Sequence, residues 1–314
     1  MSLEQELLVW LRENLPTSGR HSVGLGDDAA VLAGFGQTDV VVTTDMLTEG
    51  VDFLLEQVDP QQVGHKSLGV NLSDLAAMAA EPVAAFVSLV LPRQGSGQLT
   101  PLKLAIELYR GMIPLAEKLG VEIAGGDTNT WDGPLAISIT AIGQTTSRGP
   151  LTRSRGQVGD QLLVTGHVGG SILGRHLLVE PRVREALLLQ ERYQLNAGID
   201  VSDGLGLDVS RLAEASLVGA MLELGAIPVS DAAHQLGQRD GLSAVDHALG
   251  DGEDFELVLA VSEQEARRIL SEQPLQVPVT RIGTLIETRG LWQTSDQGQR
   301  KPLVACGYEH RGDR

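Results

Sequence analysis

Short acidic turns recur along this chain, and they constrain its fold more than any other feature of the sequence. One of them reads Gly24-Leu25-Gly26-Asp27-Asp28-Ala29-Ala30, so two neighbouring carboxylates lie between small residues just ahead of an apolar run. Paired carboxylates repel each other and are seldom buried without a cation or hydrogen-bond donors. A single turn of this kind reads most simply as a surface turn, because loops favour Asp and Gly. Its recurrence beside predicted strands and helices indicates a shared site instead.

Strand-like and helix-like segments alternate in both halves of the sequence. The first half predicts helices at 4–15, 60–80 and 101–119 and strands at 39–45, 83–91, 121–124 and 135–142. The second half predicts strands at 161–166, 218–224, 255–261 and 277–286 and helices after Gly204 and at 262–271. This alternation predicts two α/β or α+β domains. We place them at 1–150 and 151–314, because residues 145–155 are polar and basic.

Composition excludes several classes of function. The 314 residues carry 24 basic and 41 acidic side chains, a net charge of −17 that argues against a nucleic-acid partner. Cys306 is the only cysteine, so neither an intramolecular disulfide nor a cysteine-based zinc site can form. Without a secretory signal or an apolar run of membrane-spanning length, the sequence predicts no membrane partner and a cytoplasmic protein.

The acidic turns favour magnesium and a nucleotide. Aspartates next to Gly, Ser or Thr at predicted strand ends or turns are Asp27, Asp28, Asp45, Asp127, Asp200 and Asp203, and Asp74 joins them from a predicted helix. Ligands bind at strand ends in open α/β sheets, and Mg²⁺ prefers a few carboxylates together with water and phosphate oxygens. The sequence has no phosphate-binding loop of the Gly-x-x-x-x-Gly-Lys-Ser/Thr type. An ATP site would therefore be built from the acidic turns.

Three of these aspartates, and the nearby basic candidate Arg153, also have simpler explanations. Asp203 could cap the helix that follows it, since Asp is a common N-cap. Asp74 could be a solvated helix residue, Asp127 a turn residue and Arg153 a surface charge. The pattern by itself indicates a Mg-nucleotide enzyme and nothing finer.

Seven short motifs occur in an order that resembles one family. They are Gly26-Asp27-Asp28-Ala29-Ala30, Thr43-Thr44-Asp45 with Glu49-Gly50-Val51, Val70-Asn71-Leu72-Ser73-Asp74-Leu75-Ala76-Ala77-Met78, Gly125-Gly126-Asp127-Thr128, Leu151-Thr152-Arg153-Ser154, Ile199-Asp200-Val201-Ser202-Asp203-Gly204-Leu205 and Gly252-Glu253-Asp254-Phe255-Glu256-Leu257. Together they resemble the thiamine-monophosphate kinases of the aminoimidazole-ribonucleotide synthetase superfamily. The resemblance spans nearly the whole chain.

The resemblance implies a fold and an activity. It implies an N-terminal domain that dimerises and binds Mg-ATP, a C-terminal α/β domain, and a homodimer. It also implies direct phosphoryl transfer from ATP to thiamine monophosphate, giving thiamine diphosphate and ADP with Mg²⁺ as cofactor.

The resemblance further implies roles for individual residues. Metal contacts would come from Asp28, Thr43, Thr44, Asp45, Asp74, Asp127, Asp200 and Asp203, with Asp28 and Asp203 central to the chemistry. Nucleotide contacts would come from Thr44, Gly126, Asp127, Arg153 and Ser202, and substrate contacts from Asp52, Glu253 and Tyr308.

This chain departs from the family pattern at the acceptor end. Asp52 stands where the family pattern has a histidine that contacts substrate, and an anionic side chain near a substrate phosphate is electrostatically unfavourable. Tyr308 replaces a tryptophan, and the segment from Gly166 to Arg175 is short. Two alternatives stay open: a superfamily member that acts on another acceptor, and a non-catalytic nucleotide-binding relative. Selenophosphate synthetases and hydrogenase-maturation proteins are disfavoured, because the sequence lacks an N-terminal and a C-terminal cysteine.

Overall fold

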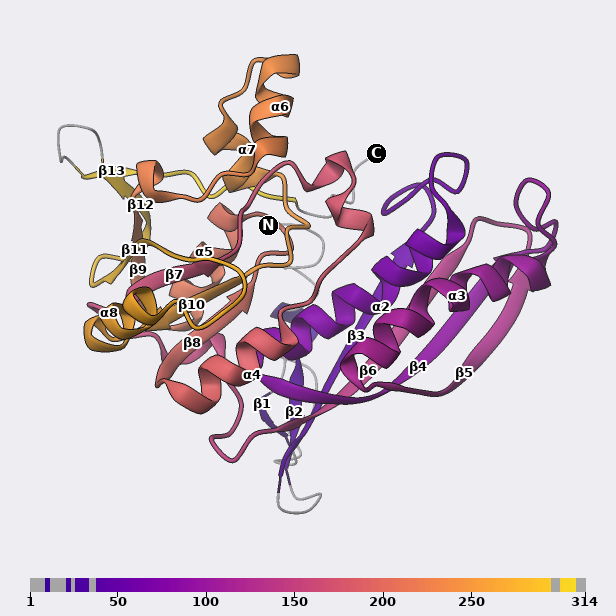
Figure 1. Cartoon of the computed structure of the whole chain (residues 1–314), viewed down its shortest axis with the longest axis horizontal. Helices are drawn as coiled ribbons and strands as arrows, with labels where there is room; N and C mark the ends of the chain where they lie inside the picture. Colours follow the sequence, from indigo (N-terminus) through magenta and orange to yellow (C-terminus); the bar gives the residue numbers. More distant parts are fainter. Residues whose placement is uncertain (1–8, 12–20, 24–25, 34–37, 295–299, 309–314) are drawn as a thin grey trace.

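Two β-sheets lie side by side, with helices packed between them (Figure 1). The computed structural model describes residues 9–11, 21–23, 26–33, 38–294 and 300–308. The central helix, α2 (Pro60–Ala77), contacts strands of both sheets, so it belongs to the cores of both halves. No helix of the described residues is long and apolar enough to cross a membrane.

The first sheet has six strands in the order β1-β2-β3-β6-β4-β5, and only the β4–β5 pair is parallel. Its strands are β1 (His21–Val23), β2 (Ala30–Leu32), β3 (Val40–Thr48), β4 (Ala80–Pro92), β5 (Glu122–Trp131) and β6 (Ala136–Thr145). Helices α2 and α3 (Pro101–Leu119) pack on one face of this sheet (Figure 1). The side chain of Thr100 caps α3 and Gly120 ends it in the left-handed conformation, as the sequence predicts.

The opposite face of the first sheet is open in this single chain. Residues of β3 and β4 alternate between buried and exposed, so every second side chain points away from the helices. Met46 is 64% exposed and Phe86 is 40% exposed on this side. An antiparallel sheet commonly has one solvated face, and these two side chains make part of this face apolar.

The second sheet has seven strands in the order β13-β12-β9-β11-β7-β10-β8, and only the β12–β9 pair is parallel. Its strands are β7 (Gln161–Thr165), β8 (Leu195–Asp200), β9 (Gly219–Leu222), β10 (Leu257–Val261), β11 (Val279–Ile286), β12 (Gly290–Thr294) and β13 (Arg300–Pro302). The helices of this half are α4 (Val183–Arg192), α5 (Leu205–Ala215), α6 (Asp231–Asp240), α7 (Ala244–Gly250) and α8 (Glu263–Glu272), with 3₁₀ turns η1 (Arg153–Arg155), η2 (Ser171–Leu173), η3 (Arg175–Leu177) and η4 (Leu224–Ala226).

Every residue of β10 is buried, because the second sheet is covered on both faces. Leu257 and Leu259 belong to a core that continues through α4 and α2 into the first sheet. Val258 and Ala260 point the other way, into a separate core under α5 and α7. A continuous apolar strand is the expected sequence for a strand in this position.

Two expectations from the sequence need correction, and a third lies largely outside the described residues. Helix α2 ends at Ala77, three residues early, because the chain turns through Ala79 at φ +48° and enters β4 at Ala80. Pro82 therefore lies inside a strand, at an irregularity in the pairing with β6 where a missing N–H is tolerated. Residues 125–128 are part of β5 and form no turn. The helix expected at 4–15 lies largely outside the described residues, of which 9–11 are helical.

Candidate active site

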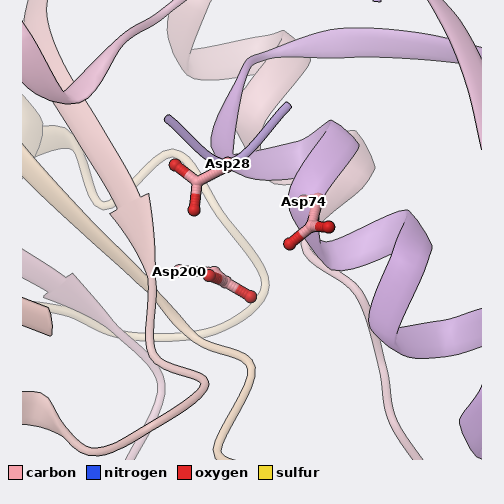
Figure 2. Close-up of side chains that lie close together, drawn as sticks. All are labelled: Asp28, Asp74 and Asp200. Atoms are coloured by element: carbon pink, nitrogen blue, oxygen red, sulfur yellow. The ribbon is translucent and has the colours of Figure 1, made fainter. Parts of the chain in front are cut away.

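Three aspartates from separate elements converge between the two sheets. Asp28 precedes β2, Asp74 lies in the last turn of α2, and Asp200 is the last residue of β8. Each contributes a carboxylate oxygen, and these oxygens all lie within 4.8 Å of one another. Figure 2 shows the three side chains pointing toward a common centre. We refer to Asp28, Asp74 and Asp200 as the aspartate cluster.

Hydroxyl groups hold two members of the aspartate cluster in place. The Thr43 hydroxyl on β3 donates to Asp74 Oδ2 at 2.5 Å. The Ser73 hydroxyl donates to Asp200 Oδ2 at 2.5 Å and so joins α2 to the second sheet. These donors fix the carboxylates without neutralising them, which leaves the negative charge available to a cation.

Burial and mutual repulsion raise the pKa values of two cluster carboxylates. The pKa of Asp74 is well above its ordinary value because the group is buried and faces Asp45, Asp200 and Asp28. The pKa of Asp200 is raised well above its ordinary value by burial and by Asp28. Three converging carboxylates with no nitrogen or sulfur ligand suit a hard divalent cation, and Mg²⁺ fits such an oxygen-only donor set.

Arg153 neutralises one side of the aspartate cluster. Its Nε donates to Asp28 Oδ2 at 3.0 Å, and its Nη2 pairs with Asp28 Oδ1. Its backbone N–H donates to Asp27 Oδ2 at 3.2 Å. Burial and the neighbouring Asp28 together raise the pKa of Asp27 to about 6. The two carboxylates of the first acidic turn therefore have different roles: Asp28 faces the cluster, and Asp27 anchors the Arg153 backbone.

The aspartate cluster opens into a pocket of about 740 Å³. The pocket is lined by residues of both halves, including nine carboxylates: Asp27, Asp28, Asp45, Asp52, Asp74, Asp200, Asp203, Asp251 and Glu253. Arg153, Arg211 and His176 line it as well. Because carboxylates so outnumber arginines, a polyphosphate would enter this pocket favourably only together with cations.

Asp203 lies on the pocket wall and does not cap a helix. Its carboxylate pairs with Arg211, which also contacts Asp208 at 3.0 Å. Helix α5 begins after Gly204 without a side-chain cap from that residue. The Asp208 carboxylate accepts the N–H groups of Asp203 and Gly204 instead, both at 3.0 Å. The capping explanation for Asp203 is therefore wrong.

All three expected substrate residues line the pocket. Asp52 Oδ2 accepts the Thr48 N–H at 2.7 Å, so its carboxylate is turned onto its own loop. Tyr308 lines the pocket, is 50% exposed, and donates its backbone N–H to Asp203 O at 2.8 Å. The Thr48 N–H therefore stabilises part of the negative charge that Asp52 is expected to bring near the substrate.

Glu253 reaches the pocket from a loop with an unusual backbone. Gly252, Glu253 and Phe255 all have positive φ, at +73°, +53° and +51°. Such conformations cost free energy in residues other than glycine and cluster at functional sites. The Glu253 N–H donates to Ser202 O at 2.6 Å, which ties the loop to another expected site residue.

Of four further residues expected to contact metal or nucleotide, two line the pocket and two do not. Asp45 lines the pocket from within β3 and not from the strand end, and its N–H donates to Asn71 Oδ1 at 3.1 Å. Thr44 also lines the pocket, but its hydroxyl accepts from Thr140 on β6. Gly126 and Asp127 lie on the edge strand β5 and do not line the pocket of their own chain.

Sequence reasoning missed Lys66, Ser73 and Arg211 as site residues. All three contact an expected site residue, and Lys66 and Ser73 are fully buried polar residues of α2. The signal was available in part: a lysine within a helix as apolar as α2 is unusual, because lysine is seldom buried without a partner.

Models of one family cover most of the chain. The model of the AIR synthase related protein N-terminal domain matches residues 26–145. The model of the C-terminal domain of the same family matches residues 142–291. Asp28 and Asp74 lie within the first matched segment, and Asp200 lies within the second.

Individual relatives match over nearly full length. The chain is 42% identical to the thiamine-monophosphate kinase of Rhodopirellula baltica over 98% of this chain and 97% of that protein. It is 32% identical to that of Escherichia coli K12, over 92% and 91%. Among solved structures, AaThiL complexed with AMPPCP and TMP superposes with a TM-score of 0.83 at 25% identity, covering 99% of each chain. A chain of a HypE-HypF complex, at 16% identity with a TM-score of 0.77 and covering 97% of this chain and all of that chain, shares the fold.

Proposed function

Because this chain belongs to the AIR synthase related family, among its thiamine-monophosphate kinases, we propose that it transfers the γ-phosphoryl group of ATP to thiamine monophosphate. The products are thiamine diphosphate and ADP. The aspartate cluster is the observation that carries the proposal, because it offers an oxygen-only cation site inside a pocket formed by both halves. Phosphoryl transfer depends mainly on cations and on positioning, and this pocket can supply both.

In this proposal, different residues hold the metal and contact the phosphates. Asp28, Asp74 and Asp200 would hold Mg²⁺, which neutralises charge on the transferring phosphoryl group when bound. Asp45 and Asp203 line the same pocket, the Thr43 hydroxyl donates to Asp74, and these three groups would complete the metal contacts. Arg153 and Arg211 are the pocket arginines that can contact phosphate oxygens once Mg²⁺ shares their aspartate partners. No side chain needs to carry the phosphoryl group covalently.

The acceptor would lie toward Glu253 and Tyr308. Val51, Ile172, Phe255 and Tyr308 give this part of the pocket apolar and aromatic surface, and Glu253 adds a carboxylate. Such a surface suits a flat heteroaromatic cation, because carboxylates and aromatic faces both attract positive charge. The free phosphate of the acceptor would then point toward the aspartate cluster.

We also propose that the protein is a homodimer formed through the open face of the first sheet. The exposed apolar side chains of β3 and β4 support this face as the contact surface. The position of Asp127 supports it as well, because Gly126 and Asp127 could reach a pocket only in a partner subunit. We thus propose that Gly126 and Asp127 contact the nucleotide bound in the pocket of the partner subunit.

We also propose a domain division and a cellular location. Residues 1–150 would form the Mg-ATP and dimerisation domain, and residues 151–314 the C-terminal domain. Strands of the first sheet end at Thr145 and those of the second begin at Gln161, which supports a division between them. A cytoplasmic location is supported by the single cysteine and by ATP as co-substrate.

Product analysis with purified protein, Mg-ATP and thiamine monophosphate tests the proposed function. We expect equal amounts of thiamine diphosphate and ADP, and no product when EDTA replaces Mg²⁺. The alternative of a different acceptor is favoured only by Asp52 in place of histidine. A panel of phosphorylated acceptors distinguishes the two, because release of ADP with another acceptor and not with thiamine monophosphate would favour the alternative.

A further inference from the structure

Lys66 lies in the middle of α2, is fully buried and carries a charge that the proposed function does not use. Its ammonium group pairs with Glu253 Oε1 at 2.5 Å and donates to Asp52 O at 3.0 Å. Burying a lysine is strongly unfavourable unless partners compensate its charge. A lysine retained at such a position is therefore expected to have a task that an apolar residue could not perform.

The two partners of Lys66 belong to different walls of the pocket, one from each half of the chain. Asp52 lies in the turn that follows β3 of the first sheet, and Glu253 lies in the loop that precedes β10 of the second. Their neighbours Val51 and Phe255 line the pocket on the same two walls. One ammonium group thus fixes the spacing of two loops that come from different halves of the chain.

The loop on the second wall is held at several further points. The Ser171 hydroxyl donates to Gly252 O at 2.6 Å. Asp254 pairs with Arg175 and accepts the Gly169 N–H at 2.7 Å. These contacts keep the backbone in its left-handed conformation, while Lys66 directs the Glu253 side chain. The backbone and the carboxylate are therefore positioned by separate interactions.

We propose that Lys66 is a positioning residue for the phosphate acceptor, which holds the Glu253 carboxylate and the Asp52 turn in the arrangement that receives a cationic heteroaromatic phosphate. The inference rests on the proposed function and deepens it. Pre-arranged contacts lower the entropy lost on binding, so Lys66 acts on acceptor affinity before any chemistry occurs. The nucleotide contacts near Arg153 lie outside its reach, because Lys66 contacts only the two loops named here among the interactions of the described residues.

Steady-state kinetics of Lys66→Met test the proposal. We expect the KM for thiamine monophosphate to rise by about tenfold or more, while the KM for ATP stays within about twofold. Lys103→Met is the matched control, since Lys103 is an exposed lysine of α3. A purely structural role would lower the melting temperature and kcat without separating the two KM values, and that result would overturn the proposal.

A double-mutant cycle identifies the partner through which Lys66 acts. In a Glu253→Gln background, Lys66→Met should raise the KM for thiamine monophosphate much less than it does in the wild type. An undiminished effect would contradict the proposal. If Lys66→Met does not fold, Glu253→Asp replaces it: the shorter side chain cannot keep both its pocket position and the Lys66 contact, so the same KM should rise. An unchanged KM in Glu253→Asp would then overturn the proposal.

The wild-type control separates this inference from the proposed function. A wild type that forms no thiamine diphosphate would overturn both. A wild type that forms it, with Lys66 variants whose KM for thiamine monophosphate is unchanged, would overturn the positioning role alone.

Discussion

Arg153 binds both oxygens of the Asp28 carboxylate, through Nε at 3.0 Å and through Nη2. Burial alone would lower the pKa of Arg153, but Asp28 and Asp27 raise it above its usual value, so the guanidinium remains charged. The pair joins the turn before β2 to the 3₁₀ turn η1 that leads into the second half. Arg153 is therefore both a structural counter-ion of the aspartate cluster and a candidate phosphate contact.

Removing this counter-ion should destabilise the metal-free protein. Arg153→Gln leaves Asp28 buried without its cation, and we expect a loss of about 3 kcal/mol in the free energy of unfolding. Mg²⁺ should restore part of that loss because it replaces the missing positive charge. Urea denaturation with and without Mg²⁺ measures both effects. Arg155→Gln is the matched control, since Arg155 is an exposed neighbour, and an equal loss in both variants would contradict this account.

Removing a cluster carboxylate should have the opposite effect on the metal-free protein. Asp74→Asn keeps an oxygen that can accept the Thr43 hydroxyl but removes a charge that repels Asp45, Asp200 and Asp28. We expect the free energy of unfolding at neutral pH to rise by about 1 kcal/mol or more, while turnover and stabilisation by Mg²⁺ are lost. Thermal and urea denaturation measure the first effect, and product formation the second.

The stability gain of Asp74→Asn should depend on pH. Because the pKa of Asp74 is raised in the folded protein, the folded state binds a proton that the unfolded chain has released above about pH 4. The stability this proton provides is complete below about pH 4 and is lost as the pH rises through the raised pKa. The gain of Asp74→Asn over wild type should therefore grow with pH. Asp132→Asn, an exposed surface change, should show no such trend, and a gain that shrinks with rising pH would refute the raised pKa.

Asp203→Asn tests whether Asp203 takes part in the chemistry. Its carboxylate is partly exposed and pairs with Arg211, so we expect the free energy of unfolding to change by less than about 1 kcal/mol. Turnover should fall by about 100-fold or more, as for loss of a group that stabilises charge in the transition state. If Asp203→Asn keeps near wild-type turnover, Asp203 takes no part in the chemistry and its role is limited to the ion pair with Arg211.

Mixed dimers test whether Asp127 acts in the partner's pocket. Asp127→Asn and Asp74→Asn should each be inactive as pure proteins. Co-refolded in equal amounts, they should regain about a quarter of wild-type activity, because half of the dimers would be mixed and each of these would hold one intact site. No recovery in a mixture that sedimentation shows to be dimeric would mean that Asp127 does not act across the subunits.

The sequence predicts the helices and strands better than it predicts the three-dimensional arrangement of the aspartates. Thr100, Pro101 and Gly120 delimit α3 as predicted, because caps and stops act locally. Asp28, Asp74 and Asp200 were named as metal residues through their motifs, but their convergence depends on α2 lying between two sheets. Pairing of distant strands determines that arrangement, and periodicity along the chain does not reveal it.

Two kinds of error have physical reasons. The sequence predicts the end of a strand at Asp45 and a turn at Asp127, because the β-branched or apolar runs stop there, but pairing with neighbouring strands continues β3 to Thr48 and β5 to Trp131, so both residues lie inside strands. Lys66 was passed over because its partners, Asp52 and Glu253, are distant in sequence. A buried charge is recognisable only when its partner is known.

The most direct measurement of the central claim follows the γ-phosphoryl group. Purified protein is mixed with Mg²⁺, γ-phosphate-labelled ATP and thiamine monophosphate, and the reaction is quenched within a single turnover. Direct transfer in the aspartate-cluster pocket predicts that the label moves into the terminal phosphate of thiamine diphosphate, with no labelled protein at any time. Label retained in ATP while the protein still binds Mg-ATP, or label found on the protein before the product, would contradict it.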